Sequence, residues 1–276
     1  MRQPRTIILE PTATPSFSHP TCFARGYGGG CSEELEKEHF ISKSILEVID
    51  RIGGGLRVTG MPWQAPGQQT VVSPRRAFTA HILCKRHNRG LSPLDKSALQ
   101  LFERLSDLRA WFDEPRVHDN HHALLVSGHD IERWMLKALI GACVSGNAQL
   151  PEGHPSDWMA PDQWLEVLFG RSSAPRGCGM YFLPPQENPA RSKVEVEFAA
   201  LGGPQPVGMK MSLCGLWFIL ALFVPTGTEP ELRGAHHRPA SFVFKEGRRR
   251  RVVWVSWPGA SVPALNDSVH VEWRRD

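Results

Sequence analysis

The side chains that could do chemistry are concentrated in two short segments near the start of the chain. The first is CSEELEKEHFISKS (31–44) and the second is LCKRHNRGLSPLD (83–95). Their reactive residues are Cys31, Glu38, His39, Cys84, His87, Asn88 and Asp95. A histidine with a near-neutral pKa can take a proton from water. Carboxylates and amide carbonyls are oxygen ligands that suit a hard divalent cation, so these residue types together could hydrolyse a phosphodiester.

In order and spacing, the two segments resemble the HNH endonucleases, a family with the ββα-metal fold. A common branch of that family has a cysteine pair, then E-H-[apolar]-I-P-K-S, and later L-C-x-x-C-N leading into a helix. This chain reads EHFISKS at 38–44 and LCKRHNRGLSPLD at 83–95, and the resemblance covers roughly residues 20–110. It departs from the pattern with eight residues between Cys22 and Cys31, with His87 in place of a cysteine, and with Ser42 in place of proline.

The resemblance implies that His39 is the general base and that Glu38 and Asn88 hold a catalytic Mg²⁺ or Mn²⁺. Adjacent residues can serve the cation and the water only if their backbone is extended or turned, so we expect a break in the chain's helical pattern at about 37–40. The family also has an acidic residue at the position of Asp95, which would help the metal or steady the loop. The alternative is that Asp95 only caps a helix that starts at Ser92.

The resemblance also implies a structural metal. Cys22, Cys31, Cys84 and His87 offer three thiolates and one imidazole, which is a normal tetrahedral zinc set. The alternative is a set of buried thiols that has lost the metal.

Three basic residues flank the second segment. Lys85, Arg86 and Arg89 would lie within reach of a bound phosphate, or else belong to a solvated loop. The run GRRRRVV (247–253) is open to the same two interpretations, because charged strand edges also discourage aggregation. We expect the histidine pairs 121–122 and 236–237 to be exposed loop residues.

Apolar periodicity predicts the elements that must position these residues. We expect helices at 32–52, at 94–112 after Ser92 and Pro93, at 129–146 and at 161–170. After residue 192 the pattern becomes typical of strands: 193–201, 209–224, a hairpin at 241–257 that turns near Glu246-Gly247, and 268–276.

The fold class we predict is α+β. An HNH nuclease module with its zinc knuckle would span 1–115, and an α+β domain ending in a mainly antiparallel sheet would span 116–276. The polar segment at 113–122 would separate them, and 276 residues suffice for two modest domains. The second domain would position substrate, sense a signal or bind a partner.

Bulk properties fit an intracellular protein that meets a polyanion. The net charge of +4 permits DNA as a partner. No secretory signal opens the sequence, so we expect a cytoplasmic location in which the six cysteines stay reduced. The most apolar stretch, at 213–224, is too short to cross a bilayer, and we expect no membrane association.

The resulting hypothesis is a metal-dependent DNA endonuclease, restrained by a regulatory protein partner or a ligand and acting in defence against foreign DNA. The alternative is a zinc-stabilised nucleic-acid-binding or adaptor module whose catalytic site is silent. A third option keeps the enzyme but makes RNA its substrate.

Overall fold

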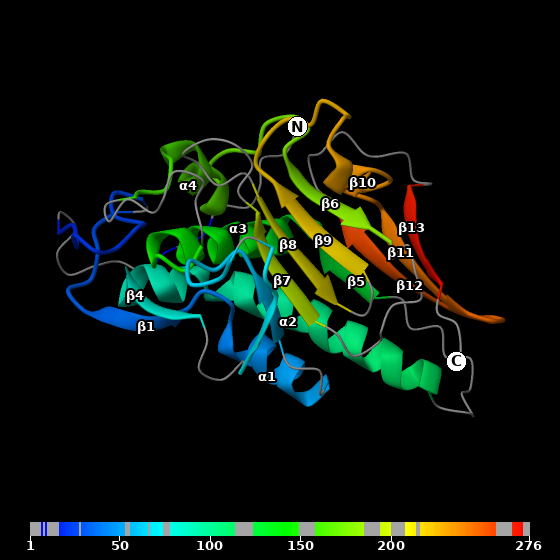
Figure 1. The fold of residues 1–276 in the computed structure, drawn as a ribbon. Coiled ribbons are helices and arrows are strands. Elements are labelled where there is room, and N and C mark those ends of the chain that lie inside the picture. Colours follow the sequence, from blue (N-terminus) through cyan, green and yellow to red (C-terminus); the bar gives the residue numbers. More distant parts are fainter. Residues whose placement is uncertain are drawn as a thin grey trace.

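The structure is a computed structural model, and it describes the greater part of the chain. The described residues are 7, 9, 17–27, 29–52, 56–65, 67–73, 78–113, 124–148, 158–184, 194–199, 208–213, 216–257 and 267–272. They form a mixed α+β protein with helices packed against several sheets (Figure 1). Within these residues no helix is both long enough and apolar enough to cross a bilayer.

One end of the molecule is built from two strands and a long helix. β1 (Leu35–His39) pairs antiparallel with β4 (Thr79–Cys84), and β4 runs directly into α2 (Lys85–Asp113). The ladder is irregular between Glu36 and Glu38, where the β4 strand carries the extra residue. Between the two strands the chain forms α1 (Lys43–Ile52), which packs on α2.

A seven-stranded sheet fills the middle of the molecule. Its order is β10-β6-β9-β8-β7-β2-β3, and its pairs are antiparallel except for β2 with β7. The strands are β2 (Leu56–Thr59), β3 (Thr70–Val72), β6 (Gly179–Leu183), β7 (Val194–Ala199), β8 (Gly208–Leu213), β9 (Leu216–Ala221) and β10 (His236–His237). Strands from the segment between β1 and β4 therefore share a sheet with strands from the later half of the chain.

A second, four-stranded sheet lies at the opposite end from β1 and β4 (Figure 1). It consists, in order, of β13 (Ser268–Glu272), β11 (Ser241–Glu246), β12 (Arg249–Ser256) and β5 (Leu124–Ser127). The β11–β12 hairpin is antiparallel, whereas β13 and β5 join it in parallel, so the expectation of a mainly antiparallel final sheet is wrong here. The hairpin turn is confirmed, with Gly247 in the left-handed region at φ 57°.

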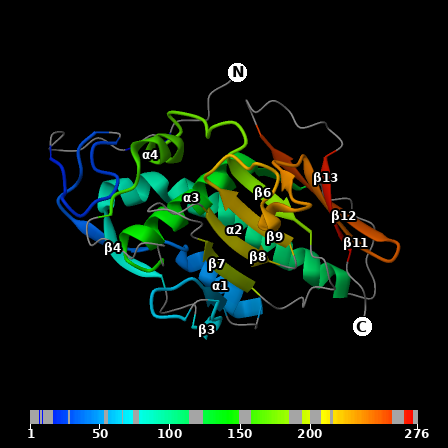
Figure 2. The same ribbon diagram turned by 45° about the horizontal axis from the view of Figure 1, so that its top comes forward.

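Helix α3 (Gly128–Val144) is the central helix. Ser127 caps its first turn, and every residue from Ile131 to Cys143 is buried. It packs on α2 along its length and also contacts β4, β8, β9 and β12 (Figure 2). The short α4 (Asp162–Leu168) packs on α3, and a 3-10 turn lies at Pro230–Leu232. The predictions of helices at 129–146 and 161–170 and of strands at 193–201, 209–224 and 268–276 are confirmed.

Two of the predicted helices begin at the wrong place. Residues 35–39 form β1 rather than the first turns of a helix over 32–52, since pairing with β4 overrides the helix propensity of the Glu- and Lys-rich sequence. The backbone at 38–39 is extended, as a site at these residues requires, but it belongs to a strand and is not a break within a helix. Helix α2 begins at Lys85 and not after Ser92, because groups distant in sequence satisfy its first amides. The Lys85 N–H donates to the Glu34 carbonyl (2.9 Å), and the Arg86 N–H donates to the Ser32 hydroxyl (3.1 Å).

The division into domains at 115 and 116 stays a prediction. Residues 114–123, which include most of the proposed linker and the pair His121-His122, lie outside the described part of the chain, as does Cys214. The other five cysteines are free and buried, and Cys143 and Cys178 are the two of them that lie outside the Cys3His cluster.

Candidate metal centre and adjoining acidic site

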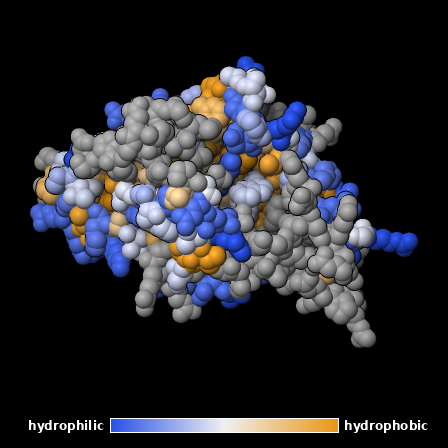
Figure 3. Space-filling model, viewed as in Figure 1, coloured by the Kyte–Doolittle hydropathy of each residue, from blue (hydrophilic) through white to orange (hydrophobic). Residues whose placement is uncertain are grey.

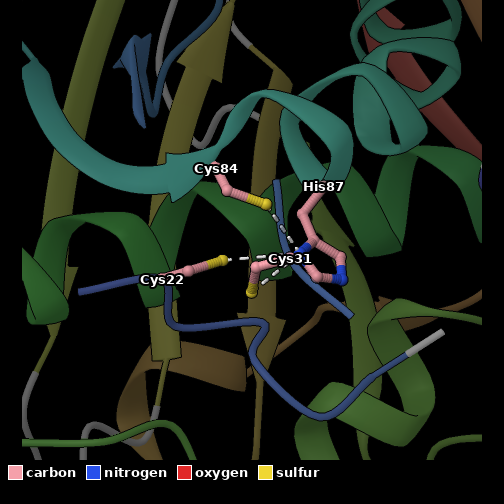
Figure 4. Close-up of side chains that lie close together, drawn as sticks. All are labelled: Cys22, Cys31, Cys84 and His87. Atoms are coloured by element: carbon pink, nitrogen blue, oxygen red, sulfur yellow. Dashed lines mark hydrogen bonds between the residues drawn. The ribbon is translucent and has the colours of Figure 1, made fainter. Parts of the chain in front are cut away.

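The four predicted zinc ligands meet at one point. Cys22 and Cys31 come from the loop before β1, Cys84 is the last residue of β4, and His87 lies in the first turn of α2. Their ligand atoms all lie within 4.8 Å of one another, and Figure 4 shows the three sulfurs and the imidazole Nδ1 pointing toward a shared centre. All four side chains are buried. The chain therefore contains a buried Cys3His cluster compatible with a zinc site.

The distances within this cluster suit a tetrahedral zinc ion. The Nδ1 atom of His87 is 3.0 Å from the Sγ of Cys84, 3.5 Å from that of Cys22 and 3.8 Å from that of Cys31. Ideal zinc–sulfur and zinc–nitrogen bonds would place sulfur and nitrogen about 3.6 Å apart. The other ring nitrogen, Nε2, lies 2.7 Å from the carbonyl of Tyr27. If Nε2 carries the proton and donates it there, Nδ1 keeps its lone pair for a metal.

The loop that carries Cys22 and Cys31 is held to the ββα unit by its backbone. The Phe23 N–H donates to the Ile82 carbonyl (3.0 Å), and the guanidinium of Arg86 donates to the Gly30 carbonyl (2.9 Å). Gly29 has a φ of 93°, and a Cβ there would lie only 3.4 Å from the Arg86 guanidinium. The glycine-rich insertion between the first two cysteines thus lets the loop wrap around Arg86.

The thiols of the cluster also interact with one another. A hydrogen bond between Cys22 and Cys84 lowers the pKa of Cys84 and raises that of Cys22, and burial raises the pKa of Cys31. A bound zinc ion would favour the thiolate form of all three.

A second group of polar residues lies at the end of β1, next to the Cys3His cluster. The amide of Asn88, one residue after the ligand His87, donates to the Glu36 carboxylate at 2.9 Å. Glu38 is only 7% exposed, and this burial raises the pKa of its carboxyl although the charge of Lys137 and hydrogen bonds from Lys137 and Asn88 act to lower it. Asn88 therefore lies among the acidic residues of β1, and its sharing of a cation with Glu38 stays a prediction.

A buried lysine completes this acidic site. Lys137 of α3 is 1% exposed, and its Nζ lies 2.6 Å from Oε1 of Glu38. The same ammonium lies 2.8 and 3.0 Å from the two carboxylate oxygens of Asp95. Asp95 also accepts a hydrogen bond from Ser42, whose hydroxyl accepts one from the indole of Trp134 (3.1 Å). The Asp95 carboxylate therefore links α2 to Lys137 of α3 and to Ser42 before α1.

The donors at this site fit a hard divalent cation. The carboxylates of Glu38 and Asp95 both pair with the ammonium of Lys137, and a third, that of Glu36, accepts a hydrogen bond from Asn88, so the site carries a net negative charge when all three are ionised. The side-chain amide of Asn88 also has a carbonyl oxygen, which is another ligand type that suits such a cation.

His39 is the last residue of β1 and lies opposite Thr79. Its imidazole is half-buried, and burial, followed by the charges of Lys37 and Lys43, lowers its pKa. The placement of His39 as general base beside Glu38 and Asn88 stays a prediction. The next residue of the ladder, Phe78, has a φ of 65°, a conformation that is uncommon for a bulky side chain and that is often found at functional sites.

The three basic residues of the second segment have different environments. Lys85 pairs with Glu34 at 2.7 Å on the surface, and Arg86 donates to the Gly30 carbonyl in the loop that carries Cys22 and Cys31. Arg89 is exposed. Of the three, Arg89 is therefore the one with the clearest access to a bound phosphate.

The arginine run at 248–251 is partly structural. The guanidinium carbons of Arg249 and Arg251 lie 4.2 and 4.0 Å from the ring centroid of Trp111, and Arg249 donates to the carbonyls at the end of α2. Trp111 and Arg251 also line a cavity of about 460 Å³ between α2 and β12. The cavity contains none of the residues of the acidic site.

The second histidine pair is not in an exposed loop. His236 and His237 form β10, with the Nδ1 of His236 2.6 Å from Asp267 and the ring of His237 against Tyr181. Pairing with β6 half-buries both histidines, so the expectation of exposed loop residues is wrong for this pair.

Sequence reasoning missed Glu36, Ser42 and Lys137 as members of the acidic site. Lys137 had a signal: its helix is apolar nearly all round, so a lysine within it has no solvent face and needs an acidic partner. For Glu36 and Ser42 no such signal exists, because their roles depend on contacts with α2 and α3.

Comparison with known proteins does not assign a function to this site. No family model, no curated protein and no solved structure matches this chain.

Proposed function

We propose that this protein is a metal-dependent endonuclease of the HNH type that hydrolyses phosphodiester bonds of DNA. The observation that carries the proposal is the arrangement of β1 and α2 beside the Cys3His cluster, where Asn88, the residue after His87, donates to Glu36, two residues before Glu38. The order β1, β4, α2 matches the ββα unit that the resemblance implies. Hydrophilic side chains also gather on the face over β1 and β4, so this end of the molecule is open to water (Figure 3).

Each residue has a distinct role in the proposed reaction. Glu38 and Asn88 would hold Mg²⁺ or Mn²⁺, which when bound supplies a Lewis acid to the phosphate and its leaving oxygen. His39 would take the proton from the attacking water, and its lowered pKa keeps the imidazole neutral and able to do so. The Cys3His cluster would hold a structural zinc and fix β1 relative to the first turn of α2.

Plasmid cleavage tests this proposal. The full chain, loaded with zinc, should nick supercoiled plasmid in Mg²⁺ or Mn²⁺, and His39→Ala should lower the rate by about 10²-fold or more, the usual contribution of a general base. His270→Ala is the matched control, because His270 is an exposed histidine on β13, in the other sheet. Unaltered zinc content and circular dichroism would show that both variants fold. Equal cleavage by His39→Ala and the control would refute the role of His39.

One observation favours a second candidate function, that of a nucleic-acid-binding module without catalytic activity. The ammonium of Lys137 already occupies one oxygen of Glu38 and competes there with a divalent cation. A silent module would bind DNA, cleave neither DNA nor RNA, and respond to His39→Ala and His270→Ala alike. A labelled RNA of the same sequence, tested under the same conditions, separates the RNA-cleaving enzyme from both.

A further inference from the structure

The acidic site is not built by the residues of the ββα unit alone. Lys137 and Trp134 belong to α3, a helix from the part of the chain to which the sequence assigns no role. Gly141, one turn further along α3, lets this helix approach β1 closely, since a Cβ at that position would lie 2.4 Å from the Cβ of Phe40. Helix α3 is therefore seated directly against the end of β1 that carries Glu38.

We infer that Lys137 is a positioning residue of the proposed cation site, whose ammonium holds Glu38 to one coordinating oxygen and keeps Asp95 away from the ion. This inference rests on the proposed function and deepens it. It assigns part of the catalytic arrangement to α3.

The contacts of Lys137 account for both effects. At 2.6 Å the ammonium occupies Oε1 of Glu38, so a cation would have to bind this carboxylate through its other oxygen. Both oxygens of Asp95 lie within 3.0 Å of the same ammonium, and Ser42 adds a further hydrogen bond. Asp95 is held in this way although it lies only seven residues from Asn88 on the same helix.

A purely structural role explains less of this arrangement. A buried ion pair seldom stabilises a fold more than apolar side chains of the same volume would. Lys137 is surrounded along α3 by apolar neighbours, and methionine would fill the same space. A lysine that points a buried charge at two carboxylates therefore suggests a function in setting the charge and geometry of the site.

The inference makes an unusual prediction for the variant Lys137→Met. Loss of the ammonium removes a repulsive charge beside the ion and frees Asp95 and the second oxygen of Glu38 to become ligands. The variant should therefore bind Mn²⁺ about tenfold more tightly than the wild type. Because the ion is then held by a different set of oxygens, cleavage at saturating Mn²⁺ should fall about tenfold or more.

The experiment measures Mn²⁺ binding to the full, zinc-loaded chain by electron paramagnetic resonance, without DNA, and plasmid cleavage separately. Lys137→Arg keeps the charge and should bind Mn²⁺ with nearly the wild-type affinity. Lys245→Met is the matched control, because it removes an exposed lysine from β11 and should change neither quantity. Weaker or unchanged Mn²⁺ binding by folded Lys137→Met would overturn the inference.

If Lys137→Met does not fold, the variant Asp95→Asn is measured in its place. This variant removes one of the two negative charges that neutralise the Lys137 ammonium, so Mn²⁺ should bind several-fold more weakly. Unchanged Mn²⁺ binding by Asp95→Asn would overturn the inference. Glu38→Gln tests the proposed function itself. If wild type and Glu38→Gln bind Mn²⁺ equally, the cation site is wrong, whatever Lys137 does.

Discussion

The replacement Cys84→Ser tests the Cys3His cluster most directly. Cys84 has the sulfur nearest to the imidazole Nδ1, at 3.0 Å, and it is the residue at which β4 becomes α2. A serine hydroxyl is a poor zinc ligand and leaves three donors for the ion.

The expected loss follows from the number of ligands. Structural zinc sites contribute about 10–16 kcal/mol to folding at neutral pH, so one ligand of four accounts for roughly 3 kcal/mol. A loss of that size weakens zinc binding by about 10²-fold. For a chain of this length it also lowers Tm by roughly 6–12 °C. The loop should remain partly attached, since the hydrogen bond from Phe23 to Ile82 does not depend on the metal.

The assay is metal analysis after dialysis against a chelator, together with thermal unfolding of the same samples. The wild type should retain about one zinc ion per chain and Cys84→Ser should lose it. Cys178→Ser is the matched control, because Cys178 is another buried thiol, outside the cluster, and its replacement should leave the zinc in place. A wild type without zinc, or a Cys84→Ser variant that keeps it with full affinity, would refute this ligand set.

Two further predictions concern α3 and β1. Gly141→Ala should destabilise the protein by about 1–3 kcal/mol in urea unfolding, because the added Cβ would lie 2.4 Å from the Cβ of Phe40. Helix propensity alone would predict that alanine stabilises the protein. A stabilised Gly141→Ala variant would therefore contradict the close packing of α3 on the end of β1. The imidazole of His39 should titrate below pH 6.5 in an NMR measurement, since burial and the charges of Lys37 and Lys43 lower its pKa. The unfolded chain then binds this proton at a higher pH than the folded one, so the stability contributed by His39 is present above pH 6.5 and is lost as the pH falls toward the folded value. A His39 titration at or above pH 6.5 would contradict this environment.

One half of the Cys3His cluster could be predicted from local spacing. Cys84 and His87 are three residues apart, and the first turn of α2, which begins directly after Cys84, brings both side chains to the same point. The joining of Cys22 and Cys31 to them, and of β1 to α2, could be predicted only by resemblance, because nothing local links these segments.

The predicted start of α2 was wrong because it, too, depends on contacts between segments that are distant in sequence. Ser92 and Pro93 have the sequence features of a helix start, but the first amides of α2 are satisfied by Ser32 and Glu34 from another part of the chain. Gly90 is tolerated within α2 because the side chain of Leu9 occupies the space where its Cβ would stand. Local sequence cannot reveal either contact.

The parallel pairing of β2 with β7 has a consequence for biosynthesis. When a ribosome has released β2, the strand that covers its edge has not yet been translated, and the nascent chain carries an unpaired edge until β7 emerges. The proposed nuclease would therefore be completed late in translation, and a shortened product that stops near residue 115 would tend to aggregate rather than cut nucleic acid.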